Sequence, residues 1–346
     1  MHFKFTGRLT LVVATTFLIA AGTALAQSGP AGITQTMTVN QPGSVDLSTP
    51  SGAACTAGGT FSAAPTCATA GTTTCNIVYN GGPVMTGPKK LRLIFYGNST
   101  WANAAYPLIT AWAGGIGGTG WANVLTEDTG SGGTPFKNAI TNSGISIASY
   151  TASAPPYYHG TLGATLTDAN LQTIVAGAIS DGLLPLDANS LYMVLTSPDV
   201  TETSGSSAFC VAFCGYHSNF TIGSTTVKYA FIGDASTQCP FNFSGNPFCF
   251  AQCTSPNSNP GVDGMISVMS HESAETFTDP LGNAWWDSRP ASPTFGNEDG
   301  DMCNFVYGTG LLTAGNGSKY NQTWGGHNWL IQQMWDLSAA CVNHHP

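Results

Sequence analysis

His271, Glu272 and Glu275 are the residues of this 346-residue chain whose types and spacing are best suited to chemistry. On a helix, His271 and Glu275 are four positions apart and share a face, and Glu272 lies beside that face. This is the spacing of an H-E-x-x-H zinc helix in which glutamate replaces the second histidine. We therefore expect His271 and Glu275 to bind zinc, with Glu272 as the general base that activates a zinc-bound water.

A zinc ion on this helix needs a third ligand from elsewhere in the chain. Glu298 and Asp301, three residues apart in an acidic, glycine-containing loop, are the favoured candidates. Asp279 lies at the exit of the helix, because Pro280 disfavours helical geometry at the residue before it. From that position we expect Asp279 to cap the helix or to join the ligands.

Acidic residues are concentrated around this helix. Eight of the 18 in the chain lie from Asp263 to Asp301, where Arg289 is the only Lys or Arg. Such a density of like charge is costly unless the side chains are solvated or a cation neutralises them. A structural calcium site is one alternative to zinc, with the ligands Asp279, Glu298, Asp299 and Asp301. A hydrogen-bonded structural histidine is another, since H-E-x-x-E is less specific than H-E-x-x-H.

Aromatic residues near the acidic stretch suggest a binding surface for an extracellular peptide or glycan. Exposed aromatic rings can stack on sugars, so Trp285, Trp286 and His217 are the candidate substrate-binding residues. His217 and His327 are also outside candidates for the third metal ligand. Ordinary core packing is the alternative for the tryptophans, and it is favoured most for Trp335.

The N-terminus predicts export. Lys4 and Arg8 precede an apolar stretch at 9–21, and small residues at 24–26 follow it, which is the order of a secretory signal peptide cleaved after Ala26. The apolar run is shorter than the ~20 residues of a spanning helix. We therefore expect a secreted protein, in the medium, a cell wall or the periplasm, with no membrane span once the signal is removed.

The cysteines and the charge agree with export. An even count of ten suggests disulfides in an oxidising compartment, with the pairing left open. The candidates in the main domain are Cys210, Cys214, Cys239, Cys249, Cys253, Cys303 and Cys341. Without the signal peptide, 9 basic residues become 7 against 18 acidic ones, a net charge of −11. This acidic balance argues against nucleic-acid partners.

Composition and patterning divide the chain into three regions. Residues 1–26 are the signal peptide, and 27–80 form a Thr/Ser/Ala/Gly-rich arm with too few large apolar residues for a core, a small β module being the alternative. Residues 81–346 form the globular domain. Its predicted strands are 91–96, 191–195 and 227–232, and its predicted helices are 101–112, 168–180 and 265–277. The alternation predicts a single disulfide-bonded α/β or α+β domain, zincin-like around the 265–277 helix.

Several short segments in a fixed order point to a known family. They are Gly-Pro-Val-Met-Thr-Gly at 82–87 with Leu-Ile-Phe-Tyr-Gly at 93–97, Phe-Cys-Gly-Tyr-His at 213–217, Tyr-Ala-Phe-Ile-Gly at 229–233 with Gln-Cys-Pro at 238–240, Gly-Val-Asp-Gly-Met at 261–265, and Trp335-Asp336 with Cys341. Together these segments resemble the EXORDIUM, or phosphate-induced protein, family over residues 82–341.

The resemblance implies secretion and a cell-wall or extracellular role. Plant members of that family are apoplastic proteins linked to cell expansion, with no established catalytic activity. They lack the His-Glu pair that this chain carries at 271–272, whereas microbial relatives look more like this chain. Two functions are therefore predicted. One is a secreted, peptidase-like, metal-dependent hydrolase, and the other is a non-catalytic extracellular protein that binds glycan or a protein partner and has a structural or vestigial metal site.

Overall fold

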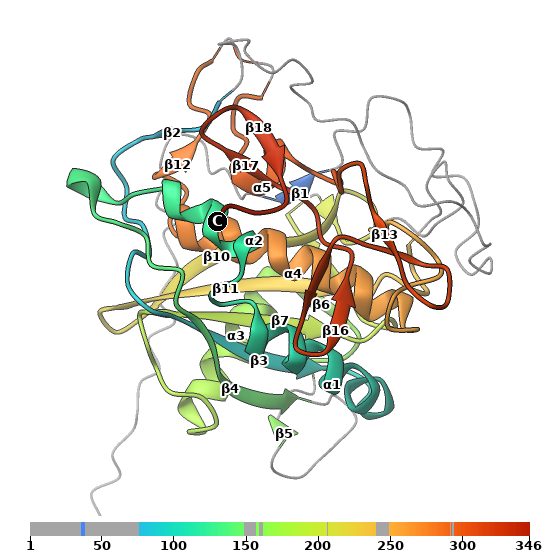
Figure 1. The fold of residues 1–346 in the computed structure, drawn as a ribbon. Coiled ribbons are helices and arrows are strands. Elements are labelled where there is room, and N and C mark those ends of the chain that lie inside the picture. Colours follow the sequence, from blue (N-terminus) through green and yellow to red (C-terminus); the bar gives the residue numbers. More distant parts are fainter. Residues whose placement is uncertain are drawn as a thin grey trace, which may run out of the picture. The chain divides into compact units, whose positions relative to one another are not determined.

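The computed structural model describes residues 36–38, 76–148, 157–158, 162–205, 207–239, 249–290, 292 and 294–346. All of them lie within one compact unit, Thr34–Pro346. The signal peptide predicted at 1–26 and most of the arm predicted at 27–80 fall outside the described residues. The unit contains a seven-stranded mixed sheet with helices on both faces, which confirms the expected mixture of α and β structure (Figure 1).

The seven strands of this sheet follow the spatial order β1-β10-β11-β7-β3-β4-β5. Strands from β11 to β5 pair in parallel, and β10 and β1 add an antiparallel edge. Parallel strands covered on both faces have nearly continuous apolar runs, as the three predicted strands do. The bounds are β1 Thr36–Thr38, β3 Lys89–Tyr96, β4 Ile140–Ala148, β5 Tyr157–Tyr158, β7 Ser190–Thr196, β10 Phe213–Ile222 and β11 Thr225–Gly233.

Three long helices cover the sheet, namely α1 Ser99–Gly115, α3 Asp168–Ser180 and α4 Pro260–Thr278. Successive residues of β10 point to opposite faces. A Cβ on Gly215 would collide with α4, whereas the Tyr216 hydroxyl donates to Asp168 of α3 at 2.9 Å. Trp112 of α1 donates to Ser270 of α4 at 3.1 Å. The layers are therefore α1 with α4, the sheet, and α3 (Figure 1).

Helix α4 is buried on nearly all sides, and its sequence explains how it tolerates this. Pro260 occupies the first turn, where its missing N–H costs nothing. The hydroxyls of Ser270, Ser273 and Thr276 donate to carbonyls four residues earlier at 2.6–2.8 Å, so none is left unpaired. The helix begins five residues before the predicted start at 265. The prediction was wrong there because Gly261 and Gly264 lower helix propensity, yet a Cβ at either would collide with a neighbour.

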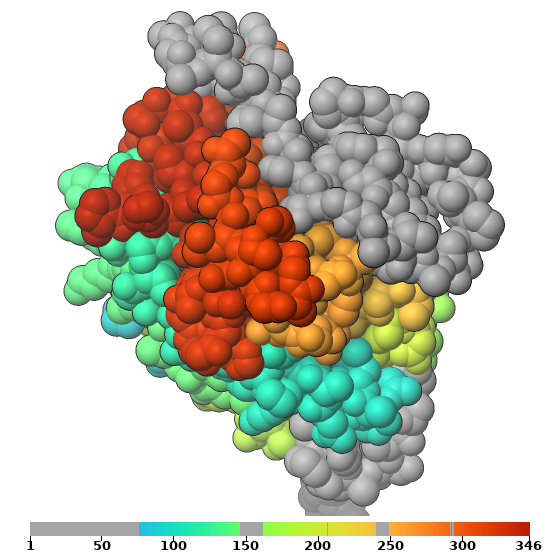
Figure 2. All heavy atoms as spheres, turned by 45° about the vertical axis from the view of Figure 1, so that its right-hand side comes forward, coloured from blue at the N-terminus to red at the C-terminus, as the bar shows by residue number. Residues whose placement is uncertain are grey.

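Smaller elements connect and cover these layers. Short helices are α2 Gly120–Asn123, α5 Asp299–Met302, η1 Val124–Glu127 and η2 Ser131–Gly133. The small sheets contain β2 Val78–Tyr79 with β12 Trp285–Trp286; β6 Thr165–Thr167 with β8 Thr201–Ser204 and β9 Ser207–Ala208; β13 Leu312–Thr313 with β14 Lys319–Tyr320; β15 Gln322–Trp324 with β16 His327–Trp329; and β17 Met334–Asp336 with β18 Ala340–Val342. Figure 2 shows the C-terminal segments, orange-red to red, gathered beside α1 in teal.

Three disulfides join described cysteines: Cys210–Cys239, Cys214–Cys249 and Cys303–Cys341. Cys253 is also disulfide-bonded, so all seven predicted cysteines are confirmed as bonded. Two of these bonds attach elements that carry candidate site residues. Cys214 lies on β10, which carries His217, and Cys303 follows α5, which carries Asp301. Within the described residues, no helix is both long and apolar enough to cross a bilayer.

Candidate metal centre

The face of α4 that was singled out in the sequence points into the protein. His271, Glu272 and Glu275 are fully buried. His271 Nε2 lies 3.0 Å from Glu275 Oε1, as expected for side chains one turn apart. Asp301 comes from α5, and its Oδ1 lies 3.7 Å from His271 Nε2 while its backbone N–H donates to Glu275 Oε1 at 3.0 Å. The structure therefore brings one of the two favoured third ligands to the histidine.

The close approach of α5 to α4 depends on a residue without a side chain. A Cβ on Gly300 would lie 2.8 Å from His271 Nδ1 and 2.9 Å from Glu275 Oε1. Such contacts are shorter than packed interiors allow. Glycine at this position thus lets Asp301 reach the helix.

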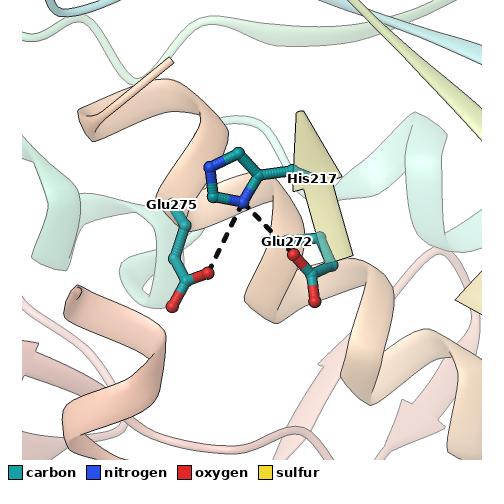
Figure 3. Close-up of side chains that lie close together, drawn as sticks. All are labelled: His217, Glu272 and Glu275. Atoms are coloured by element: carbon teal, nitrogen blue, oxygen red, sulfur yellow. Dashed lines mark hydrogen bonds and ion pairs between the residues drawn. The ribbon is translucent and has the colours of Figure 1, made fainter. Parts of the chain in front are cut away.

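His217 enters the same cluster from the sheet. Its Nδ1 lies 3.3 Å from Glu272 Oε2 and 3.6 Å from Glu275 Oε2, as Figure 3 shows. Its Nε2 lies 3.6 Å from Glu298 Oε2. Glu298, the other favoured third ligand, is therefore next to His217. Residues 215 and 217 share the face of β10 that packs on α4, because side chains alternate along a strand. His217, an outside candidate ligand in the sequence, is therefore part of the cluster.

Two groups of three donors emerge, each with donor atoms within 4.8 Å of one another. The first, here called the His271 group, contains His271, Glu275 and Asp301. The second, the His217 group, contains His217, Glu272 and Glu275. All these residues are buried, and Glu275 belongs to both groups.

Gln332, which the sequence analysis missed, orients His271. Its Oε1 lies 3.1 Å from His271 Nδ1, and its Nε2 donates to the Gly300 carbonyl at 2.9 Å. Because the second bond requires the amide nitrogen, the oxygen faces the ring and accepts from Nδ1–H. In the neutral imidazole, His271 Nε2 then carries the lone pair, directed at Glu275 and Asp301. The available signal was the pair Gln332-Gln333 inside the apolar stretch 329–335.

Many polar atoms of the cluster are buried without a hydrogen-bond partner. Such atoms are costly, and each needs an explanation. They are His271 Nε2, Glu272 Oε1, Glu275 Oε2, Asp301 Oδ1, Asp279 Oδ2, Asp299 Oδ2 and both carboxylate oxygens of Glu298. Imidazole nitrogen with carboxylate oxygen suits zinc and manganese. The residues present therefore fit a divalent cation.

The electrostatics show an excess of negative charge. Burial alone would lower the pKa of His217 and of His271, but the neighbouring glutamates outweigh it and raise each to about 10. Burial, followed by repulsion from neighbouring carboxylates, raises the pKa of Glu298 and Asp301 well above the usual range. Two imidazoles thus face more carboxyl groups than they can neutralise, and the balance needs either bound protons or a cation.

Comparison with known proteins now assigns the chain to a family. The model of the phosphate-induced protein 1 conserved region matches residues 138–343. The chain belongs to the phosphate-induced protein 1 family. This matched region contains both donor groups and Gln332. The family resemblance seen in the sequence is thereby confirmed.

Individual relatives of this EXORDIUM-like chain agree. Protein EXORDIUM-like 5 of Arabidopsis thaliana is 32% identical over 299 residues, which cover 76% of each chain. Protein EXORDIUM-like 3 of the same plant is 32% identical over 291 residues, covering 74% of this chain and 79% of its own. Protein PHOSPHATE-INDUCED 1 of Nicotiana tabacum is 29% identical over 176 residues, 44% of this chain and 53% of its own. No solved structure matches the chain significantly.

Two other predicted acidic ligands of this family member, Asp279 and Asp299, each use one carboxylate oxygen to accept backbone hydrogen bonds. Asp279 caps the end of α4, and its Oδ1 accepts from the backbone N–H groups of Asn283 and Ala284 at 2.6 and 2.7 Å. Asp299 accepts from the backbone N–H of Trp335 at 2.7 Å. Burial raises the pKa of both carboxyl groups, that of Asp299 to about 8.

The remaining predicted site residues lie outside the donor groups. His327 Nδ1 lies 3.0 Å from Asn257 Oδ1, in the β15–β16 hairpin. Trp285 is 8% exposed in an apolar cluster separate from the main core, and its indole N–H donates to the Thr129 carbonyl. Trp286 is half-buried and packs edge-on against the exposed ring of Phe295. Of the tryptophan pair, only Trp286 keeps a partly accessible surface.

Proposed function

We propose that this EXORDIUM-like protein is an exported, metal-dependent hydrolase whose zinc ion binds His271, Glu275 and Asp301. Catalytic zinc sites have three protein ligands and leave one position for water, and the His271 group offers three. When bound, the ion would acidify a water and polarise a substrate carbonyl or glycosidic centre. The observation that carries this proposal is His271 Nε2, which is buried and held by Gln332 toward two carboxylates, 3.0 Å from Glu275 Oε1 and 3.7 Å from Asp301 Oδ1.

Glu272 is the general base of the proposal. Its Oε2 is held by His217 Nδ1 at 3.3 Å, and its Oε1 has no hydrogen-bond partner. Burial raises the pKa of Glu272, and His217 offsets part of that rise. A base needs a pKa nearer neutrality than an exposed carboxylate has, so this direction suits the role.

Export in the proposal rests on the predicted signal peptide and on the disulfides, which persist in oxidising compartments. The substrate class is an extracellular peptide or glycan. The partly exposed Trp286 and Phe295 give an aromatic surface of the kind that stacks on sugar rings or apolar side chains.

The test measures metal and hydrolysis in the same purified full-length chains. Wild type should bind zinc in at least one equivalent per chain and hydrolyse either casein or a cell-wall glucan. His271→Ala should lose the zinc ion of the His271 group and the activity. Glu272→Gln should keep zinc and lose at least a hundredfold in hydrolysis, the scale of a general base. His327→Ala is the matched control and should behave as wild type. A wild-type chain that binds no divalent metal after dialysis against it would refute the proposal.

A structural metal ion in a non-catalytic extracellular protein is the second candidate, and burial favours it. His271, Glu272, Glu275 and Glu298 are fully buried, and the most exposed of the donors, Asp301, is only 7% exposed. Structural sites are closed to solvent, whereas catalytic ones stay open to substrate. Bound metal in wild type, with no hydrolysis and no effect of Glu272→Gln, would select this candidate. Calcium in place of zinc would also select it, because calcium prefers oxygen ligands.

A further inference from the structure

We infer that the cluster binds two divalent metal ions, one in the His271 group and one in the His217 group, with the carboxylate of Glu275 bridging them. The inference rests on the proposed metal centre and deepens it. Glu275 turns Oε1 toward His271 and Oε2 toward His217, at 3.0 and 3.6 Å. Each ion would therefore take a different oxygen of the same carboxylate.

Distance argues against a single shared ion. Two ligands of one zinc ion lie no more than about 4.2 Å apart, since each sits about 2.1 Å from the metal. In the part of the chain that the structure describes, the donor groups within 4.8 Å are the His271 group and the His217 group, and neither contains both imidazoles. One ion would thus have to leave one histidine unused, whereas two ions use both.

Each histidine also has a polar side chain beside the ring nitrogen that does not face the ion, hydrogen-bonded at His271 and at ion-pair distance at His217. Gln332 Oε1 faces His271 Nδ1 at 3.1 Å, which leaves Nε2 for the first ion. Glu298 Oε2 faces His217 Nε2 at 3.6 Å, which leaves Nδ1 for the second. Glu298 is fully buried beside this nitrogen, and Asp279 is its acidic neighbour. In both sites, a side chain from another element faces the ring nitrogen that is not directed at the ion.

Charge balance supports two ions as well. Glu272, Glu275 and Asp301 are ligands in the two groups, and Glu298 is the buried carboxylate behind His217. Two divalent cations carry as much positive charge as these four carboxylates carry negative charge. A single cation would leave two of these negative charges to be balanced by bound protons or by protonated imidazoles.

Two ions about 3.5–4 Å apart are typical of phosphatases, nucleases and aminopeptidases. In this assignment Glu272 binds the second ion through Oε2, and its Oε1 remains free to face a water. The cluster then belongs to the class of two-metal hydrolytic centres. Carboxylate ligands reduce the positive charge with which one ion acidifies a water, and the second ion offsets this reduction.

Metal stoichiometry and magnetic coupling test the inference without relying on activity. Full-length protein stripped with a chelator is dialysed against Zn²⁺ or Mn²⁺ and analysed by elemental mass spectrometry. We expect two ions per chain. With Mn²⁺, electron paramagnetic resonance should show an exchange-coupled spectrum instead of the hyperfine pattern of isolated ions. Both measurements use wild type, so they do not depend on whether a variant folds.

Variants then locate the two ions. His271→Ala and His217→Ala should each retain one ion and lose the coupled spectrum, while His327→Ala should retain two ions and the coupling. One ion in wild type, or two ions without coupling, would overturn the bridged pair and leave the single-metal proposal standing. No ion in wild type would overturn both.

Discussion

At the scale of single residues, the centre depends on a few side chains that fix the direction of others. Gln332 is the clearest case, because it bonds both to His271 and to the backbone of α5. The residue is not itself a member of either donor group. Its effect is to hold one imidazole tautomer and one ring orientation, which metal affinity requires.

We predict that Gln332→Ala lowers metal affinity by about tenfold to a hundredfold, the usual cost of losing a residue that orients a ligand. Competition with a chromogenic chelator measures this. Gln333→Ala is the matched control, since the Gln333 amide lies near Gly308 and not in the cluster. Equal affinities for the two variants and wild type would show that Gln332 does not position the histidine.

At the scale of elements, a loop between β12 and α5 sets where Glu298 and Asp301 lie. Asp287 organises this loop. Arg289 donates to it through Nε and an Nη at 2.7 and 2.9 Å, and the hydroxyls of Ser292 and Thr294 donate to its Oδ2. Its backbone pairs with Gly296 and with residue 297, immediately before Glu298. The acidic ligands are therefore held by a network anchored on another acid.

We predict that Asp287→Asn destabilises the fold by about 1–3 kcal/mol at pH 7, the range for hydrogen bonds to a buried charge. Burial alone would raise the pKa of Asp287, but Arg289, Ser292 and Thr294 outweigh it and lower the pKa. Because the pKa of Asp287 is lower in the folded state than the unfolded value of about 3.9, the ionised carboxylate stabilises the fold above that pH. This stabilisation is lost as the pH falls through the folded-state pKa. The difference between variant and wild type should therefore shrink below about pH 4.

Urea unfolding at pH 7 and at pH 3 measures this difference. The control is Asp181→Asn, because Asp181 is an exposed residue that ends α3 and should change stability by no more than about 0.5 kcal/mol. A pH-independent loss for Asp287→Asn would assign its effect to packing instead of charge.

At the scale of the whole molecule, the centre joins distant parts of the chain. β10, α4, α5 and the segment around Gln332 all contribute, and disulfides attach β10 and the end of α5. A cation at their meeting point would offset repulsion between buried carboxylates. Metal should therefore contribute to the stability of the entire fold.

We predict that chelation lowers the melting temperature reversibly. A ligand that binds only the folded state at a thousandfold excess over its dissociation constant adds about 4 kcal/mol of stability. Differential scanning calorimetry with and without EDTA, followed by addition of Zn²⁺, measures the shift. A His217→Ala/His271→Ala double variant should not respond to EDTA. An unchanged melting temperature for wild type would mean that no ion supports the fold.

Local sequence specified much of this protein. The 168–180 helix has the predicted bounds and its Thr167 cap, because periodicity and capping act over a few neighbouring residues. The 91–96, 191–195 and 227–232 strands and the core of α4 follow from apolar patterning in the same way. The pairing of His271 with Glu275 also needs only helical geometry.

Tertiary structure decided the rest. His217 reaches Glu272 across 54 intervening residues because β10 pairs at the sheet edge on which α4 packs, and no local pattern encodes that neighbour. Asp301 on α5 and Gln332 just before β17 reach the cluster through the Gly300 contact and the disulfide that follows α5. Local preferences act through bonded neighbours, whereas convergence of buried donors depends on how the layers pack, and packing is a property of the folded whole.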